Sequence, residues 1–377
     1  MIILNLKLDH ILGFNQFEVN FSYPRKLGRS IIEGECLKGI PSFRYKKLNV
    51  FVGSNASGKT SLIRAIWTIL SFLRNKNGED LKKIVNCNYD SSYIAVDYVL
   101  GDANDYRLYR LVFKTKNNGR NDFDCSLTHS MIALKQGDSY EKVKDYLDKP
   151  YEIVSSLREV NNNENSFVGW HMVLPCTEEN FDEIHFAKCL TKRENDDYMA
   201  TLNAVMQTLD PAIRGIKKSQ DARDAVVIDY GHNERIIAQA GNKLTELRRL
   251  SSGTKYGFNI TNTLFAIKHH LNGLYLIDEQ FSYVNSDIEA SLLAKMVELL
   301  GDDEQLFFTT HNQRILAMGF PFHSFYFMKK EVFDGESEIS VSCASEFENR
   351  NNVSPFNMYE NDMFGCAPKT WMIDNIN

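Results

Sequence analysis

The stretch LNVFVGSNASGKTS, residues 48–61, constrains the fold more than any other part of the sequence. A run of apolar and β-branched residues leads into a glycine-bounded loop, Gly53 to Thr60, and a helical pattern follows. The loop fits G-x-x-x-x-G-K-S/T, a pattern in which backbone N–H groups surround phosphate oxygens. Because a strand precedes the loop and a helix follows it, we predict a nucleotide-phosphate site in an α/β fold.

Each position of this loop has an expected role. Gly53 and Gly58 let the backbone curl, and the helix after them adds the positive end of its dipole. Lys59 supplies a cation to the β- and γ-phosphates, and the Thr60 hydroxyl can ligate Mg²⁺. The expected ligands are therefore a nucleoside triphosphate and Mg²⁺. The predicted nucleotide-binding residues of the loop are Gly53, Asn55, Ser57, Gly58, Lys59, Thr60 and Ser61.

Length and charge limit the class of protein. A chain of 377 residues favours one large α/β domain with an insertion, or two domains. The net charge of −6 opposes a generally basic surface, although it permits a local basic groove. The seven cysteines are scattered without a C-x-x-C pair, which indicates reduced thiols and a cytoplasmic location. No apolar run approaches the ~20 residues that span a bilayer, so we expect no membrane partner.

Alternating residues predict antiparallel strands in the first half of the chain. Residues 2–8 and Phe17 to Phe21 are expected to form a hairpin, and three further strands are expected at Tyr93–Leu100, Tyr106–Lys114 and Phe123–Leu134. Residues 22–47 are rich in Lys and Arg. We interpret them as a solvated loop, with contact to nucleic acid as the alternative.

The middle of the chain predicts a compact helical lobe. From Glu178 to Arg249 the pattern is largely helical, with a short β-like interruption at Ala225–Ile228. No heptad pattern persists for three or four repeats, which argues against a long coiled coil. We therefore expect three parts: 1–175 with the phosphate loop and an antiparallel β subdomain, 176–249 as the inserted lobe, and 250–377.

The segment LSSGTK, residues 250–255, precedes an apolar-periodic helix from Tyr256 to Leu271. Two hydroxyls and a glycine at a helix start can bind an anion. Taken alone, the same segment is an ordinary helix N-cap.

The segment GLYLIDEQ, residues 273–280, is an apolar strand that ends in Asp278 and Glu279. An aspartate at this position can hold Mg²⁺, and the glutamate beside it can orient and deprotonate the attacking water. The alternative is that both acids cap the helix that starts near Asn285. A second buried strand, Gln305–Thr310, is followed by His311, where a γ-phosphate sensor is expected.

The order of these four segments resembles the ABC-type ATPases, in particular the soluble branch that includes the structural-maintenance-of-chromosomes proteins. The resemblance implies an α/β P-loop NTPase with an ABC-ATPase head: a mixed central sheet, an antiparallel β subdomain and an inserted helical lobe. It implies that Asp278 is the metal ligand, Glu279 the catalytic glutamate and His311 the switch histidine. It also implies that two copies meet head to tail, with Ser251, Ser252 and Gly253 of one copy closing over the ATP of the other. The family's glutamine loop has no clear counterpart, since Gln136 is the only glutamine between Gly53 and Gly169.

At a finer level the chain is similar to compact ATPases of bacterial anti-phage and abortive-infection systems. The opening ILNLKLDHILGFNQFEVNF, the LSSGT segment and a tail with Tyr359, Gly365 and Pro368 carry this resemblance. It implies a regulatory ATPase that controls a separate effector, a nuclease or toxin. A DNA-repair or chromosome-maintenance ATPase that binds nucleic acid directly is the alternative, and the ATP subunit of a transporter is the weakest one.

Overall fold

The structure is a computed structural model of the chain. It describes residues 1–23, 30–103, 105–117, 123–148, 152–154, 169–174, 185–189, 191–239, 249–281, 284–333, 336–347 and 353–366. The chain divides into two compact units. The first contains residues 1–172, 273–276 and 301–377, and the second contains residues 173–272 and 277–300.

The elements of the first unit are β1 (Ile2–Asp9), β2 (Phe17–Asn20), β3 (Cys36–Leu37), β4 (Ile40–Arg44), β5 (Leu48–Val52), α1 (Lys59–Asn75), α2 (Gly78–Lys82), β6 (Ser91–Leu100), β7 (Arg107–Asn117), β8 (Phe123–Ala133), α3 (Tyr140–Val143), η1 (Lys144–Asp148), β9 (Glu152–Val154), β15 (Gln305–Thr310), η4 (Gln313–Ala317), η5 (Phe322–Ser324), β16 (Phe325–Phe333), β17 (Glu336–Cys343), α7 (Ala344–Phe347) and α8 (Pro355–Glu360). Strands β10 (Trp170–Val173) and β14 (Leu274–Asp278) cross the division between the units. The second unit contains α4 (Lys192–Leu209), β11 (Gly215–Lys218), β12 (Ala225–Gly231), β13 (Glu234–Gln239), α5 (Ser252–Lys268) and α6 (Ser286–Leu299).

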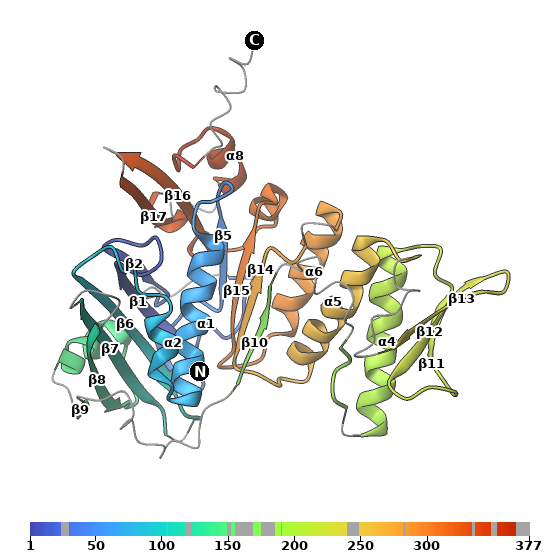
Figure 1. Cartoon of the computed structure of the whole chain (residues 1–377), viewed down its shortest axis with the longest axis horizontal. Coiled ribbons are helices and arrows are strands. Elements are labelled where there is room, and N and C mark those ends of the chain that lie inside the picture. The colour runs from blue at the N-terminus through green and yellow to red at the C-terminus, as the bar shows by residue number, and fades with distance from the viewer. Residues whose placement is uncertain are drawn as a thin grey trace, which may run out of the picture. The chain divides into compact units, whose positions relative to one another are not determined.

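An antiparallel sheet of six strands forms one part of the first unit (Figure 1), in the order β2-β1-β6-β7-β8-β9. The predicted hairpin is β1 paired with β2, and the three predicted strands are β6, β7 and β8. Alternation along these strands sends one set of apolar side chains, including Leu6, Val96 and Phe113, into a core that contains Leu62 and Ile66 of α1. The sequence prediction for this subdomain is confirmed.

A second six-stranded sheet holds the phosphate loop, in the order β10-β14-β15-β5-β16-β17. Both β15 and β16 run parallel to β5, whereas β17 is antiparallel to β16, so the sheet is mixed as predicted. Every residue of β5 is buried, as expected for a central strand that is covered on both faces. The buried Gln305 amide joins the two sheets, because its Oε1 accepts from the Ile3 N–H at 2.9 Å and its Nε2 donates to the Ile3 carbonyl at 3.1 Å.

The second unit corrects the helical prediction for residues 176–249. Within the described part of that range, α4 is helical, but β11, β12 and β13 form an antiparallel sheet in that order. The β-like interruption predicted at Ala225–Ile228 is the start of β12. Its partner strands β11 and β13 were not predicted from the sequence. Leu202 and Met206 of α4, Ile228 and Ile236 of the sheet, and Phe258 of α5 share one core. This core explains why the sheet forms: its apolar face needs a helix to cover it.

The basic segment at residues 22–47 is only partly the solvated loop that we predicted. It contains the β3–β4 hairpin, and Lys46 and Lys47 are 6% and 4% exposed. The Lys46 ammonium donates to the Asn20 carbonyl at 3.1 Å and lies 4.6 Å from the centroid of the Tyr326 ring. Buried ammonium groups need such partners, so these two lysines belong to the fold. Arg25, Lys26 and Arg29 lie outside the described residues. None of the described helices is long and apolar enough to cross a membrane.

Candidate nucleotide-binding site

The loop between β5 and α1 lies close against β16. A Cβ atom on Gly53 would clash with the carbonyl oxygen of Met328 and would lie 2.7 Å from Ser57 Oγ. Gly58 has φ of 102° and is the N-cap of α1, and a Cβ there would lie 2.9 Å from Ile339 Cδ1. Both glycines of the motif are therefore required, the first by close approach and the second by its backbone conformation as well.

The Lys59 side chain lies beneath the curl of the loop. It is 3% exposed, and its Nζ donates to the carbonyl oxygens of Gly53 at 2.9 Å and Ser54 at 3.0 Å. Ser57 Oγ lies 3.5 Å from the same nitrogen. The ammonium group is thus held by the loop itself, and its contact with a phosphate stays a prediction.

His311 follows β15, and the structure places it beside the phosphate loop. Thr310 pairs with Val52 in the parallel ladder of β15 and β5, so the next residues of both strands emerge together. His311 Nδ1 lies 3.0 Å from the Gly53 carbonyl oxygen and 3.5 Å from Lys59 Nζ. Because a carbonyl can only accept, Nδ1 carries the proton in this hydrogen bond. Lys59 and His311 therefore donate to the same carbonyl group.

The start of α1 fits a bound phosphate. No side chain caps this end of the helix, and no acidic residue lies in its first turn. Its first N–H groups can therefore accept an anion without competition from a carboxylate. Thr60 is exposed and Ser61 is half-buried, so the Thr60 hydroxyl is accessible to a metal ion. Asn55 is exposed at the tip of the loop. These residues fit ATP phosphates and Mg²⁺.

The LSSGTK segment forms the start of α5 in the second unit. Ser251 is the N-cap, and its Oγ accepts from the Thr254 N–H at 3.1 Å. Ser251 and Ser252 are exposed, whereas Gly253 is half-buried. The N-cap interpretation of Ser251 is confirmed. The Ser252 hydroxyl makes no hydrogen bond within the described part of the chain and is open to another ligand.

The two acids after β14 differ in their surroundings. Asp278 is the last residue of the strand and is fully buried. Glu279 is half-buried and has φ of 43°, a left-handed conformation that is uncommon for a residue with a side chain and is enriched at functional sites. Helix α6 is capped by Asn285, whose side chain accepts from the Asp287 N–H at 2.8 Å. A capping role does not account for Asp278 and Glu279.

The structure brings together Gly53, Ser57, Lys59 and His311 within the first unit. Ser251, Ser252 and Gly253 lie in the second unit, as do Asp278 and Glu279. Gln136 is exposed in a turn, and nothing in its surroundings marks it as the missing glutamine loop. No group of three or more His, Cys, Asp or Glu side chains gathers as a metal site among the described residues.

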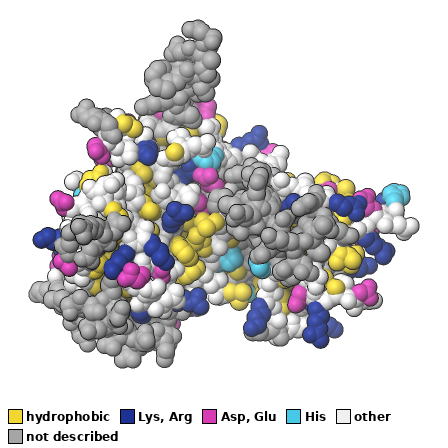
Figure 2. Space-filling model, in the orientation of Figure 1, with side chains coloured by type: hydrophobic (Ala, Val, Ile, Leu, Met, Phe, Trp, Pro, Cys, Tyr) yellow, Lys and Arg dark blue, Asp and Glu magenta, His cyan; other side chains and the backbone are white. Residues whose placement is uncertain are grey.

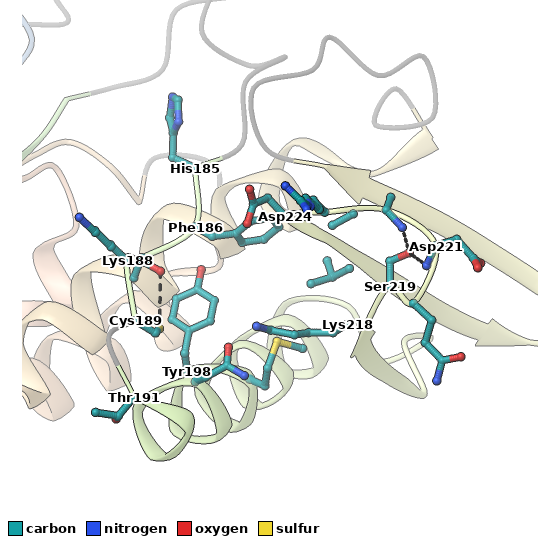
Figure 3. Close-up of a pocket in the computed structure, with 18 residues that line it drawn as sticks. His185, Phe186, Lys188, Cys189, Thr191, Tyr198, Lys218, Ser219, Asp221 and Asp224 are labelled. Carbon is teal, nitrogen blue, oxygen red and sulfur yellow. Dashed lines mark hydrogen bonds between the residues drawn. The ribbon is translucent and has the colours of Figure 1, made fainter.

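A hollow of about 840 Å³ in the second unit was not predicted from the sequence. It lies between the 185–189 segment, α4 and the turn from β11 to β12. Figure 3 shows Lys218 extending across it toward Tyr198 and Cys189. The Tyr198 hydroxyl donates to Asn262 Oδ1 at 2.8 Å, and burial raises the pKa of Tyr198 above its ordinary value. No local motif marks this hollow, because three separate segments build it.

Comparisons with known proteins agree with the fold. A family model described as an AAA domain matches residues 5–331. A solved Smc head bound to the C-winged helix domain of ScpA is similar, with 13% identity, a TM-score of 0.50, and coverage of 92% of this chain and 100% of that one. An Smc head with an extended coiled coil, bound to the C-terminal domain of ScpA from Pyrococcus furiosus, has 11% identity, a TM-score of 0.51, and coverage of 92% and 97%. None of the curated protein sequences matches. At this identity the two structures show the fold alone, which is the ABC-type head that the motifs predict.

Proposed function

The chain belongs to the AAA-domain family, and on that premise we propose that it is an ATPase that works as a head-to-tail dimer or a larger assembly. The observation that carries the proposal is the shared hydrogen bonding of Lys59 and His311 to the Gly53 carbonyl, at the uncapped start of α1. A lysine beneath such a loop and a histidine at its side are suited to phosphate oxygens.

The residues of the loop bind and orient the nucleotide. Lys59 exchanges its loop carbonyls for phosphate oxygens, and the N–H groups of α1 direct their dipole at the same anion. Thr60 and Asp278 would hold Mg²⁺. Bound ATP supplies the phosphoanhydride bond for hydrolysis, and bound Mg²⁺ neutralises charge on the phosphates. His311 would act as a γ-phosphate sensor by bonding to that phosphate in place of the Gly53 carbonyl.

Glu279 is the general base that takes a proton from the attacking water. Glu279 is half-buried, directly follows a buried strand and has a left-handed backbone conformation. Ser252 of a second copy completes the site. Ser251 already caps its own helix, so Ser252 has the hydroxyl that is available to that nucleotide.

The biological role that we propose is in anti-phage defence, where the ATPase cycle restrains or releases a separate effector, a nuclease or toxin. The support is the sequence resemblance of the opening, the LSSGT segment and the tail. Tyr359 lies in the core beside Phe327, and Gly365 has φ of 63°, so both have structural roles as well. Pro368 lies outside the described residues.

The second candidate is a DNA-repair or chromosome-maintenance ATPase, and the Smc-head fold favours it. Such a protein needs a positive surface for the phosphate backbone. Figure 2 shows Lys and Arg side chains interspersed with Asp and Glu over the described surface of that view, without one basic face. The charges on this one face therefore give this candidate less support than a continuous basic surface would.

Two variants test the ATPase. Glu279→Gln is expected to slow phosphate release by about 10²–10⁴-fold, because a general base is lost, and to accumulate an ATP-bound dimer in light scattering. Glu298→Gln, an exposed glutamate on α6, is the matched control and should behave as wild type. The proposal would be refuted if the wild-type protein stayed monomeric with ATP and the Lys59→Ala variant hydrolysed ATP at the wild-type rate.

A separate experiment distinguishes the two roles. Co-purification of Glu279→Gln with the product of a neighbouring gene, a nuclease or toxin, supports the defence role. Tight, salt-sensitive binding of duplex DNA by the purified chain alone supports the second candidate.

A further inference from the structure

One face of the antiparallel sheet packs against α1. The opposite face is apolar near one end of its strands and polar further along. Near one end, Ile2, Val99 and Leu108 are covered by the side chains of α3 and η1. Further along the same face lie a polar row, Asn5, Asp97, Arg110 and Ser130, and then a row of Lys7, Ala95, Val112 and Thr128. Because Ala95 and Val112 are small, a hollow of about 370 Å³ forms above them, which we call the sheet hollow. Tyr93, Lys114, Leu147 and Asp148 complete its lining.

Two buried side chains of the sheet hollow each carry a polar atom that has no hydrogen-bond partner among the described residues. Asn5 is 6% exposed, and its Nδ2 donates to Glu18 Oε1 at 2.9 Å, which fixes the orientation of the amide. Its Oδ1 is buried and accepts no hydrogen bond from any described residue. Ser130 is 5% exposed, and its hydroxyl makes no hydrogen bond within the described ranges.

The simplest alternative is that this face is ordinary solvated sheet. One face of an antiparallel sheet often contacts water and carries polar residues. Such residues are exposed, however, whereas Asn5 and Ser130 are more than nine-tenths buried. A buried polar group that lacks a partner costs about 1–3 kcal/mol, so a ligand that supplies the partner has a favourable place to bind.

The charges around the hollow show what it can accept. Arg110 donates to both oxygens of Asp97 at 2.7 Å and also pairs with Asp148, and the Tyr140 hydroxyl donates to Asp97 at 2.6 Å. The Arg110 charge is therefore taken up by these two carboxylates, and the hydrogen bonds from Arg110 to Asp97 raise the pKa of the guanidinium above its usual range.

One cation at the hollow differs from the others. Lys7 pairs with Glu18 at 3.1 Å. The Lys114 ammonium lies 5.7 Å from the centroid of the Tyr93 ring, and no carboxylate pairs with it in the described part of the chain. Lys114 is therefore the cation that is available to an anion.

We propose that the sheet hollow binds a phosphorylated sugar, either free or as the sugar-phosphate part of a nucleotide. The apolar surfaces of Ala95 and Val112 form a floor for the sugar ring. Its hydroxyls donate to Asn5 Oδ1 and bond with Ser130, and the phosphate pairs with Lys114. A volume of 370 Å³ is at the small end of the range for ligand pockets, which suits one sugar phosphate.

Calorimetry on the full-length Lys59→Ala variant tests this site, because that background disables the nucleotide loop. Ribose 5-phosphate and AMP represent the two sources of the ligand. Binding of either one, with orthophosphate and ribose at least about tenfold weaker, supports the proposal. Equal binding of orthophosphate, or no binding of ribose 5-phosphate and AMP, overturns it.

Two substitutions locate the binding. Lys114→Gln is expected to weaken binding about tenfold, and Lys116→Gln, an exposed lysine two residues along the same strand, should change it less than twofold. Ser130→Ala should also weaken the binding of ribose 5-phosphate while leaving the temperature of thermal unfolding unchanged. Binding that Lys114→Gln and Ser130→Ala leave intact would place the ligand elsewhere and refute the assignment. Loss of ATP hydrolysis in Glu279→Gln is independent of every one of these outcomes.

Discussion

Substitution of Gly53 by alanine is a direct test of how the phosphate loop is held. The added methyl group would clash with the Met328 carbonyl oxygen, which belongs to β16 and is fixed between β5 and β17. It would also lie 2.7 Å from Ser57 Oγ, and Ser57 is 1% exposed. Neither neighbour can move freely, so the loop itself must shift.

The cost follows from these contacts. Inserting a methyl group into a closely packed site costs about 1–3 kcal/mol, a large part of the 5–15 kcal/mol that stabilises a typical domain. Because Lys59 Nζ lies 3.5 Å from Ser57 Oγ, the shift also displaces the ammonium group. We therefore expect Gly53→Ala to lower stability by about 2 kcal/mol and to weaken ATP binding.

Urea denaturation followed by circular dichroism measures the stability, and a fluorescent ATP analogue measures the affinity. Gly215→Ala is the matched control, because the nearest atom to its added Cβ, Asn203 Oδ1, would be 3.9 Å away. The control should stay within about 0.5 kcal/mol of wild type. If Gly53→Ala were as stable as Gly215→Ala and bound ATP normally, the close approach of the loop to β16 would be wrong.

Three further substitutions are expected to change stability by separate mechanisms. Asp97→Asn should cost about 3–5 kcal/mol in urea denaturation, because it leaves the Arg110 charge without its buried partner. Ser251→Ala should cost about 1 kcal/mol through loss of the α5 N-cap, whereas an unchanged stability would show that another group caps the helix. Burial, with a smaller contribution from Lys76, lowers the pKa of His129 from 6.5 to about 4. The unfolded chain therefore takes up this proton first, and stability should fall by about 3 kcal/mol as the pH falls from about 6.5 to 4. His129→Gln should remove that part of the pH dependence, and an unchanged pH profile would contradict it.

Sequence reasoning succeeded where local pattern and fold agree. Buried β5 and the helix α1 follow directly from apolar residues around a constrained loop, and the strands β6 to β8 follow from alternation with polar turns. The position of His311 beside the loop could be predicted because parallel neighbouring strands emerge at the same edge.

The second unit shows why the rest could not be predicted. Strand β11 has four residues, GIKK, of which only Ile216 is buried, so its periodicity is too short to recognise. Strand β13, ERIIAQ, has polar ends that resemble a helix surface. The turn between β12 and β13 did contain a signal, because Gly231, His232 and Asn233 all have positive φ and glycine and asparagine favour that conformation.

The sheet hollow and the burial of Lys46 had no local signal at all. Each depends on side chains from several strands, and strand register decides which of them meet. The order of the motifs likewise gave no sign that the phosphate loop belongs to the first unit, whereas Asp278 and Glu279 belong to the second.

The position of β5 in its sheet has a consequence for the time course of synthesis. Val52, at the start of the phosphate loop, pairs with Phe327 of β16. Strand β5 therefore cannot form this pairing until the ribosome has added a further 275 residues. At a translation rate of about 5–20 residues per second, the delay is roughly 15–55 s. During this interval the nascent chain carries a hydrophobic strand without its final neighbours. A ribosome-bound chain that ends before β15 should therefore bind no nucleotide. The interval before β15 and β16 are synthesised is also the stage at which a chaperone would be needed most.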